Sequence, residues 1–231
     1  METPDKQESF NIATAVANLH RSLEEKFILV GGAALVCQGS TRITKDVDLL
    51  LPSAPISHPA FTLDHPPEVT RRDGVIYTKA GETEFPVDIL RSVIGDKTYE
   101  DLEPFTTTIL DGVKALDLPI ALGIKIRCWY MRGDDDHGLR KQRSDLEDIA
   151  FISRRMRETG KVVDNVVAKA IPVGCYSMQL VKYSLEVAGC LDQFLVVGGD
   201  RFQVSWEDDS EDQREWYTLL IADQEEIADT D

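Results

Sequence analysis

The chain has 231 residues, of which 41 are acidic and 25 are basic, so its formal net charge is −16. A chain of this length builds one domain with a modest extension and is too short for a fusion of two enzymes. Its 42% apolar and 29% charged residues exclude the disordered and collagen-like classes and indicate a soluble globular protein.

The acidic side chains are concentrated at the C-terminal end. Residues 207–231 hold eleven carboxylates and one basic side chain, a net charge of −10, whereas residues 1–206 hold 30 acidic and 24 basic side chains, a net charge of −6. Lys and Arg supply most of the affinity for phosphates, so a uniformly acidic surface would repel nucleic acid. A localised acidic tail leaves anionic substrates possible, and we expect the tail to bind a basic partner.

Four cysteines lie far apart, and no two of them form a Cys-x-x-Cys pair. This spacing indicates neither a zinc site nor a disulfide framework, so reduced thiols are expected. The N-terminal residues lack the basic and apolar regions of a signal peptide. The longest apolar run, residues 27–37, has eleven residues and is too short to span a bilayer. We expect a cytoplasmic protein without membrane partners, with the nucleus as the alternative compartment.

The first half of the chain alternates between strand and helix patterns. The predicted elements are, in chain order, a helix over 11–25, a strand over 27–30, a helix over 33–38, a strand over 47–51, a loop over 52–67, and strands over 74–78 and 85–90. The loop holds five prolines, which a strand within a sheet does not tolerate. The last two strands form a hairpin across residues 79–84, with Gly81 in the turn.

From residue 118 the pattern becomes helical, with Asp117 typical of an N-cap and Pro119 of a first helical turn. The further predicted elements are an acidic turn over 133–138, helices over 139–158, 162–170 and 176–188, and a hairpin of strands over 194–197 and 201–204 around Gly198-Gly199-Asp200. His137 lies in the acidic turn between two glycines, so we interpret it as a loop residue rather than a metal ligand.

The order of these elements, a small sheet followed by helices, predicts the α/β (α+β) class. We expect residues 1–117 to form a core with a small mixed β-sheet flanked by helices. Residues 118–206 are expected to form a helical C-terminal part that packs on the core, and residues 207–231 the acidic tail.

Gly31-Gly32 ends the predicted strand over 27–30 where a helix begins. A backbone without Cβ atoms can approach a phosphate closely, and a helix N-terminus offers free N–H groups. The pair therefore suits a phosphate-binding turn. The alternative for the two glycines is ordinary turn chemistry.

Asp46 and Asp48 lie two residues apart in the next predicted strand. Both carboxylates should project from one face of the strand, while Val47 and Leu49 project from the other. Two carboxylates held close together repel each other unless a cation lies between them. Magnesium prefers carboxylate, phosphate and water oxygens, so the pair predicts a magnesium–triphosphate site. A solvated strand face is the alternative.

The segment from Gly31-Gly32 to the Arg-x-Thr-x-Asp-x-Asp run at residues 42–48 resembles the signature of the DNA polymerase beta-like nucleotidyltransferase superfamily. The resemblance is to its minimal members and to the nucleotidyltransferase-like toxins of abortive-infection systems, and it covers about residues 27–155. The superfamily commonly has Gly-Ser where this chain has Gly31-Gly32. The resemblance implies the nucleotidyltransferase fold and a nucleotide-binding set: Gly31, Gly32, Arg42, Thr44, Lys125 and Asp145.

The resemblance also implies a third carboxylate on a later strand, which Asp88 supplies. Asp46, Asp48 and Asp88 would then be the catalytic residues and the ligands of two Mg²⁺ ions. A strand-end aspartate exposed to water is the alternative for Asp88.

Lys125 and the later Lys-x-x-x-Asp-x-x-Asp run at residues 141–148 resemble segments of the toxin-like branch. The resemblance implies that Lys125 contacts nucleotide phosphates. Asp145 and Asp148 share a helix face and could pair with Lys125 or Arg127 of the preceding helix. The alternative is a structural ion-pair network between two packed helices.

The expected function is transfer of a nucleoside monophosphate from a nucleoside triphosphate, such as ATP, to an acceptor hydroxyl or phosphate. The acceptor could be a small molecule, an RNA or a protein. Two alternatives stay open: a catalytically silent nucleotidyltransferase fold that binds or regulates, and a toxin-type nucleotidyltransferase that acts on RNA.

Overall fold

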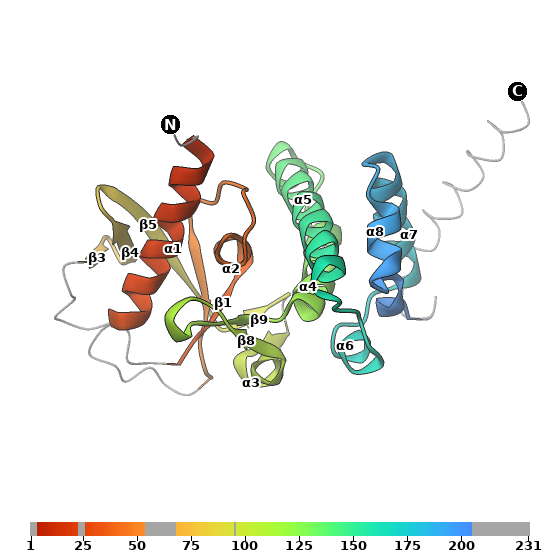
Figure 1. The fold of residues 1–231 in the computed structure, drawn as a ribbon, viewed down its shortest axis with the longest axis horizontal. Helices are drawn as coiled ribbons and strands as arrows, with labels where there is room; N and C mark the ends of the chain where they lie inside the picture. The colour runs from red at the N-terminus through yellow and green to blue at the C-terminus, as the bar shows by residue number, and fades with distance from the viewer. Residues whose placement is uncertain (1–3, 23–25, 54–67, 95, 205–231) are drawn as a thin grey trace, which may run out of the picture. The chain divides into compact units, whose positions relative to one another are not determined.

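The computed structural model describes residues 4–22, 26–53, 68–94 and 96–204 (Figure 1). Most of the predicted proline-rich loop and all of the predicted acidic tail lie outside the described residues. Within the described part of the chain, no helix is long and apolar enough to cross a membrane.

The chain divides into two compact units, Met1–Asp117 and Leu118–Asp231. The first holds a seven-stranded mixed sheet with helices, and the second is helical. The predicted mixture of a mixed sheet and helices is thereby confirmed at the level of fold class.

The first unit is built around its sheet. Its elements are, in chain order, α1 (Pro4–Ser22), β1 (Ile28–Val30), α2 (Gly31–Cys37), β2 (Val47–Leu50), β3 (Val69–Arg72), β4 (Val75–Ala80), β5 (Thr83–Leu90), β6 (Ser92–Val93), β7 (Lys97–Thr98), α3 (Tyr99–Leu102), η2 (Glu103–Phe105), β8 (Thr106–Thr108), η3 (Leu110–Gly112) and β9 (Lys114–Leu116). The strand order is β3-β4-β5-β2-β1-β9-β8, while β6 and β7 form a separate pair. β2 is parallel to β5 and β1 is parallel to β9, whereas the other neighbouring strands are antiparallel.

The hydrophobic core of this unit lies between the sheet and the helices α1 and α2 (Figure 1). Val47 and Leu49 of β2 are fully buried in it, together with Val16 and Leu19 of α1. Because side chains alternate along a strand, Asp48 projects from the opposite face. The predicted alternation of Val47 and Leu49 with Asp48 is confirmed, whereas Asp46 lies one residue before β2 and outside the strand.

β4 and β5 form the predicted hairpin, but both strands are longer than predicted. Ala80 pairs with Thr83, so Gly81 and Glu82 alone make the turn. The predicted six-residue connection is wrong. A two-residue turn needs a residue with positive φ, and Gly81 supplies it at 60°.

The sequence pattern does not predict β3 or β9. β3 ends in two exposed arginines and shows no clear alternation, because it lies at the edge of the sheet. β9 has only three residues, and it is defined by the pairing of its Ala115 with Leu29 of β1, which is distant in the sequence. Neither strand carries a local signal strong enough to identify it.

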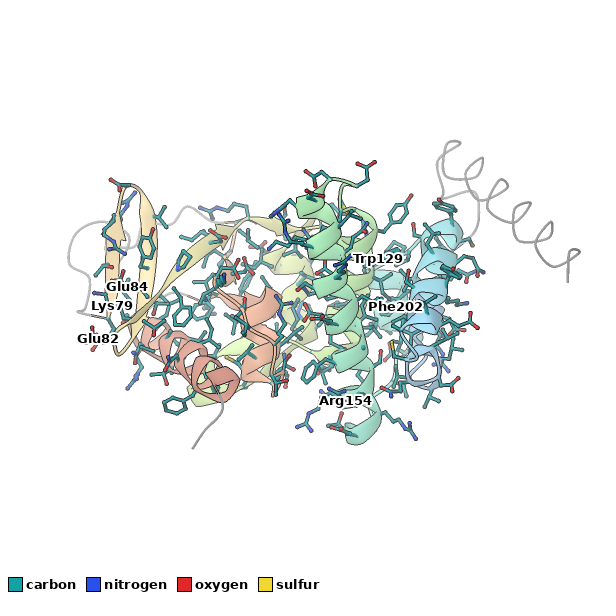
Figure 2. The ribbon with its side chains drawn as sticks, turned by 90° about the horizontal axis from the view of Figure 1, so that it is seen from above. Lys79, Glu82, Glu84, Trp129, Arg154 and Phe202 are labelled. Atoms are coloured by element: carbon teal, nitrogen blue, oxygen red, sulfur yellow. The ribbon has the colours of Figure 1, made fainter. Side chains whose placement is uncertain are left out.

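Within residues 118–204, the second unit holds the helices α4 (Leu118–Tyr130), α5 (Asp136–Thr159), α6 (Asn165–Ala170), α7 (Cys175–Val187), α8 (Leu191–Val196) and η4 (Gly199–Phe202). α4 packs along α5. Phe202 is fully buried (Figure 2) and lies against Gly123 of α4, where an added Cβ would be 2.7 Å from a ring carbon. Glycine at position 123 therefore allows the aromatic ring to pack against the helix.

α5 begins earlier than predicted. The side chain of Asp135 caps the helix by accepting a hydrogen bond from the Gly138 N–H at 2.6 Å. His137 consequently lies in the first helical turn, and the prediction that it lies in a loop is wrong. The aspartates were read as turn residues, whereas one of them acts as the N-cap.

The predicted hairpin around Gly198-Gly199-Asp200 is also wrong. Residues 191–196 form α8, and the segment after Gly198 is a 3₁₀ helix. A short apolar run cannot be assigned to strand or buried helix from periodicity alone. Gly198, with φ of 76°, separates these two helices rather than two strands.

Candidate active site

Gly31 lies at the junction between β1 and α2, directly beside the acidic face of β2. Its φ is +67°, a conformation that side chains rarely adopt. A Cβ atom at this position would overlap the carboxylate of Asp48. Glycine is thus required here both by the backbone conformation and by the close approach of Asp48.

Gly32 makes a second close approach, to the segment that precedes β2. A Cβ atom at Gly32 would lie 2.7 Å from Thr44 Oγ1 and 3.0 Å from an Arg42 guanidinium nitrogen. The fold therefore brings the predicted glycine pair together with Arg42, Thr44 and Asp48, although ten or more residues separate them in the sequence.

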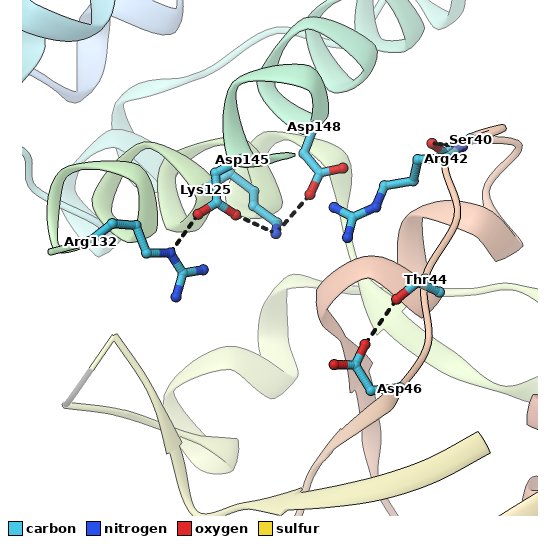
Figure 3. Close-up of polar contacts among 8 residues, drawn as sticks. All are labelled: Ser40, Arg42, Thr44, Asp46, Lys125, Arg132, Asp145 and Asp148. Atoms are coloured by element: carbon cyan, nitrogen blue, oxygen red, sulfur yellow. Dashed lines mark hydrogen bonds and ion pairs between the residues drawn. The ribbon is translucent and has the colours of Figure 1, made fainter. Parts of the chain in front are cut away.

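Thr44 orients Asp46. Its hydroxyl donates a hydrogen bond of 2.9 Å to Asp46 Oδ1 (Figure 3). Thr44 itself is buried, while Asp46 is half-buried one residue before β2 begins. A hydrogen bond to the ionised carboxylate fixes its rotamer and leaves Oδ2 for a further partner.

Asp48 and Asp88 are direct neighbours across the parallel strands β2 and β5. Residues paired in register on adjacent strands project from the same face, so the two carboxylates lie side by side. Val87, the residue before Asp88, is buried in the core on the opposite face. Asp88 is exposed and Asp48 is half-buried, so the pair is open to solvent.

The oxygen ligands of Asp46, Asp48 and Asp88 suit Mg²⁺ in chemical type. Among the residues that the structure describes, however, no three His, Cys, Asp or Glu side chains are grouped closely enough to hold a metal ion. The fit to a metal centre is therefore partial. Asp48 and Asp88 form the close pair, and Asp46 is turned toward Thr44. A site with all three carboxylates stays a prediction.

Lys125 and Asp145 lie in the second unit, in an ion-pair network between α4 and α5. Lys125 Nζ lies 2.9 Å from Asp145 Oδ1 and 2.8 Å from Asp148 Oδ2, and Arg132 Nε lies 2.8 Å from Asp145 Oδ2 (Figure 3). The side chains of Lys125, Asp145 and Asp148 are 12%, 3% and 1% exposed. This geometry matches the structural alternative for these residues.

The network changes the acid–base behaviour of Lys125. Burial lowers the pKa of the amine, but the carboxylates of Asp148 and Asp145 outweigh burial, so the pKa is raised above its usual value. The amine therefore stays charged, and it donates hydrogen bonds to two carboxylates. Its role as a nucleotide ligand is a prediction that these contacts do not favour.

Arg132, which pairs with Asp145, is a member of this network that the sequence pattern does not indicate. It follows the last turn of α4, thirteen residues before its partner, so neither helical spacing nor a motif links the two. The signal for Arg132 is indirect: two buried aspartates need a second cation besides Lys125, because buried charges are usually paired.

Comparisons with known proteins give no relative: no protein-family model, curated protein or solved structure matches the chain. Arguments about function therefore depend on the geometry of the chain itself. That geometry brings together the seven predicted site residues of the first unit: Gly31, Gly32, Arg42, Thr44, Asp46, Asp48 and Asp88.

Proposed function

We propose that the protein is a metal-dependent transferase with a nucleotidyltransferase fold, which moves a nucleoside monophosphate from a nucleoside triphosphate to an acceptor. The observation that carries the proposal is the in-register pair of Asp48 and Asp88, with Gly31 closely apposed to Asp48. Two carboxylates and a backbone that a phosphate can approach are the groups that such chemistry requires.

The aspartates would hold Mg²⁺. Asp48 and Asp88 offer adjacent carboxylates, and Asp46 would join them by exchanging its hydrogen bond with Thr44 for the metal. Bound Mg²⁺ would neutralise charge on the triphosphate and favour ionisation of the acceptor hydroxyl.

The remaining residues position the substrate. The start of α2 would offer backbone N–H groups to the phosphates, whereas the space that a Cβ would fill is taken by Asp48 at Gly31 and by Thr44 and Arg42 at Gly32. Arg42 would add positive charge. The acceptor oxygen forms a bond to the α-phosphorus as the bond from that phosphorus to the bridging oxygen breaks, and pyrophosphate leaves. Asp88, the exposed member of the pair, would accept the proton of the acceptor hydroxyl.

Magnesium-dependent release of pyrophosphate from each of the four nucleoside triphosphates tests this proposal. We expect release by the wild-type chain and a loss of at least about a hundredfold in the rate with Asp46→Asn, because the charge of one metal-binding carboxylate is removed. Asp134→Asn, which alters an exposed aspartate outside the site, is the matched control. Absence of release with all four triphosphates and with added RNA, protein and small-molecule acceptors would contradict the proposal.

A second candidate is a nucleotide-binding module without catalysis. It is favoured by one observation: within the described residues, the three aspartates do not form a group that could hold a metal ion. A binding module would retain triphosphate binding, measured by calorimetry, without releasing pyrophosphate. The same two measurements therefore separate the two candidates.

A further inference from the structure

The face of the sheet that carries Asp48 and Asp88 continues across β5, β4 and β3. Pro86 lies two residues before Asp88 on the same side of β5, and it pairs with Tyr77 of β4. Tyr77 pairs in turn with Thr70 of β3. Residues directly opposite each other in antiparallel strands share a face, so these side chains form one continuous surface with the carboxylates.

This surface has an aromatic and basic character near Tyr77. The guanidinium carbon of Arg72 lies 4.4 Å from the centre of the Tyr77 ring. Lys79, two residues along β4 from Tyr77, projects from the same face, and its Nζ lies 2.9 Å from Glu84 Oε1. Glu84 also pairs with Arg72. We call Arg72, Tyr77 and Lys79 the aromatic–basic patch.

The opposite face of β4 is already occupied. Ile76 and Ala80 are buried in the core under α1, and Thr78 Oγ1 donates a hydrogen bond of 2.8 Å to the Ala15 carbonyl. The patch, by contrast, is partly exposed: the Arg72 side chain is 56% exposed, those of Lys79 and Glu84 are 33% and 27% exposed, and Tyr77 is half-buried. Figure 2 shows Lys79 and Glu84 close together at the turn end of the hairpin.

The ion pairs within the patch contribute too little to stability to account for it. Exposed ion pairs contribute at most about 1 kcal/mol to stability, so Arg72 and Lys79 can exchange Glu84 for another anion at small cost. Within the patch, Arg72 and Lys79 share one carboxylate, Glu84, while Asp73 and Glu82 lie in the turns at the two ends of β4.

The sheet order assigns the patch to one side of the reaction centre. β2 and β5 carry the aspartate pair, β1 and the glycine turn lie beyond β2, and β4 and β3 lie beyond β5. A triphosphate at the glycine turn would therefore leave the β4 side open for the other substrate. Tyr77 pairs with Pro86, which lies only two residues before Asp88 on β5. A single nucleotide can span the short distance between the patch and Asp88.

We propose that the aromatic–basic patch is the binding site for the acceptor, and that the acceptor is a phosphorylated nucleoside. Its base would stack with Tyr77 and Arg72, and its phosphate would contact Arg72 and Lys79. Free nucleotides and the end of a single-stranded oligonucleotide share this chemistry. The role as acceptor site rests on the proposed transferase function, whereas nucleotide binding at the patch does not.

Binding measured without magnesium or triphosphate tests the patch by itself. The probes are adenosine 5′-monophosphate, by calorimetry, and a fluorescein-labelled hexamer of riboadenylate, by anisotropy. We expect Tyr77→Leu to raise Kd by about fivefold or more through lost stacking. Arg72→Gln combined with Lys79→Gln should also raise Kd and reduce its dependence on salt.

Arg155→Gln is the matched control, because Arg155 is an exposed arginine that also pairs with a glutamate, Glu158. Its Kd should equal that of the wild type. Circular dichroism of each variant shows whether it is folded. If Tyr77→Leu unfolds, the double variant Arg72→Gln/Lys79→Gln still tests binding at the patch. A raised Kd for the monophosphate alone would indicate that the acceptor is a free nucleotide. A raised Kd for the hexamer alone would indicate that it is the end of a strand. No binding of either probe, or wild-type binding by Tyr77→Leu, would overturn the proposal.

Asp46→Asn separates failure of the patch from failure of the transferase function. We expect this variant to bind both probes normally and to release pyrophosphate at least about a hundredfold more slowly than the wild type. Patch-dependent binding in a wild type that releases no pyrophosphate would overturn the acceptor role and the transferase together, but not nucleotide binding. Pyrophosphate release with no probe binding would overturn the patch alone.

Discussion

At the scale of single residues, Gly31 couples the backbone conformation of the site to its carboxylates. It combines a positive φ with a position where any Cβ would meet the Asp48 carboxylate. Alanine at this position would therefore either force the Asp48 carboxylate into another rotamer, away from Asp88, or shift the start of α2.

We expect Gly31→Ala to lower the free energy of unfolding by more than the roughly 1–2 kcal/mol that left-handed backbone conformation costs a residue with a Cβ atom. Gly160→Ala is the matched control, because Gly160 has almost the same φ, +68°, with no atom within 4 Å of an added Cβ. Urea denaturation followed by circular dichroism measures both. Equal destabilisation by the two substitutions would contradict the close approach of the Asp48 carboxylate to Gly31.

Cys37, in the last turn of α2, gives a chemical test of the same helix. Burial raises the pKa of its thiol to about 12. The thiolate is the reactive form, so at pH 8 the thiol should react with iodoacetamide far more slowly than an unperturbed cysteine with a pKa near 8.5. Mass spectrometry of the native and urea-unfolded protein measures alkylation at Cys37. Equal rates in the two states would contradict the packing of α2 against the sheet.

At the scale of elements, the network of Lys125 with Asp145 and Asp148 connects α4 to α5. Removing one member of a buried ion pair leaves an uncompensated charge, which typically costs about 3–5 kcal/mol. We expect Lys125→Met to destabilise the chain by an amount of this order. Arg155→Gln breaks an exposed ion pair on α5, the helix that carries Asp145 and Asp148, and should lower the free energy of unfolding by no more than about 1 kcal/mol.

The raised pKa of Lys125 also predicts a pH dependence. A group whose pKa is higher in the folded state stabilises the fold fully below its unfolded pKa, about 10.4 for lysine. That contribution disappears as the pH rises through the higher folded pKa. Unfolding free energies measured from pH 9 to 11.5 should therefore fall more steeply for the wild type than for Lys125→Met, and parallel curves would contradict the network.

The elements that were predicted correctly are those whose pattern is local and strong. The helix over 11–25 is present as α1, although α1 begins at Pro4 and residues 23–25 lie outside the described part. The acidic strand is present as β2, and the helix from residue 118 as α4. The elements that were missed depend on the rest of the fold. β9 is defined by its pairing with β1, and the apolar run that forms α8 is equally compatible with a strand.

The candidate site was predictable to a similar extent. The spacing of Asp46 and Asp48 predicts a shared strand face, but β2 begins only at Val47, so Asp46 lies outside the strand and the shared face stays a prediction. The resemblance supplies Asp88 as the third carboxylate. The register that places Asp88 beside Asp48 could not be predicted, because it depends on a parallel pairing across about 40 intervening residues. The patch around Tyr77 was missed for the same reason: Arg72 lies on β3, which carries no clear strand signal.

At the scale of the whole molecule, the net charge of −16 says little about the substrate, because the tail over residues 207–231 contributes −10. We expect removal of this tail to leave triphosphate binding unchanged, since the proposed site residues all lie before it. Calorimetric titration with ATP and magnesium compares the truncated and full-length chains. A marked loss of affinity on truncation would mean that the tail takes part in the site.

The central claim is that Asp48 and Asp88 hold the metal–triphosphate beside Gly31. A crystal structure of the wild-type chain with Mg²⁺ and a non-hydrolysable triphosphate tests it most directly. We expect metal density between the two carboxylates and phosphates against the start of α2. A triphosphate bound elsewhere on the chain, or an ordered triphosphate with no metal at Asp48 and Asp88, would contradict it.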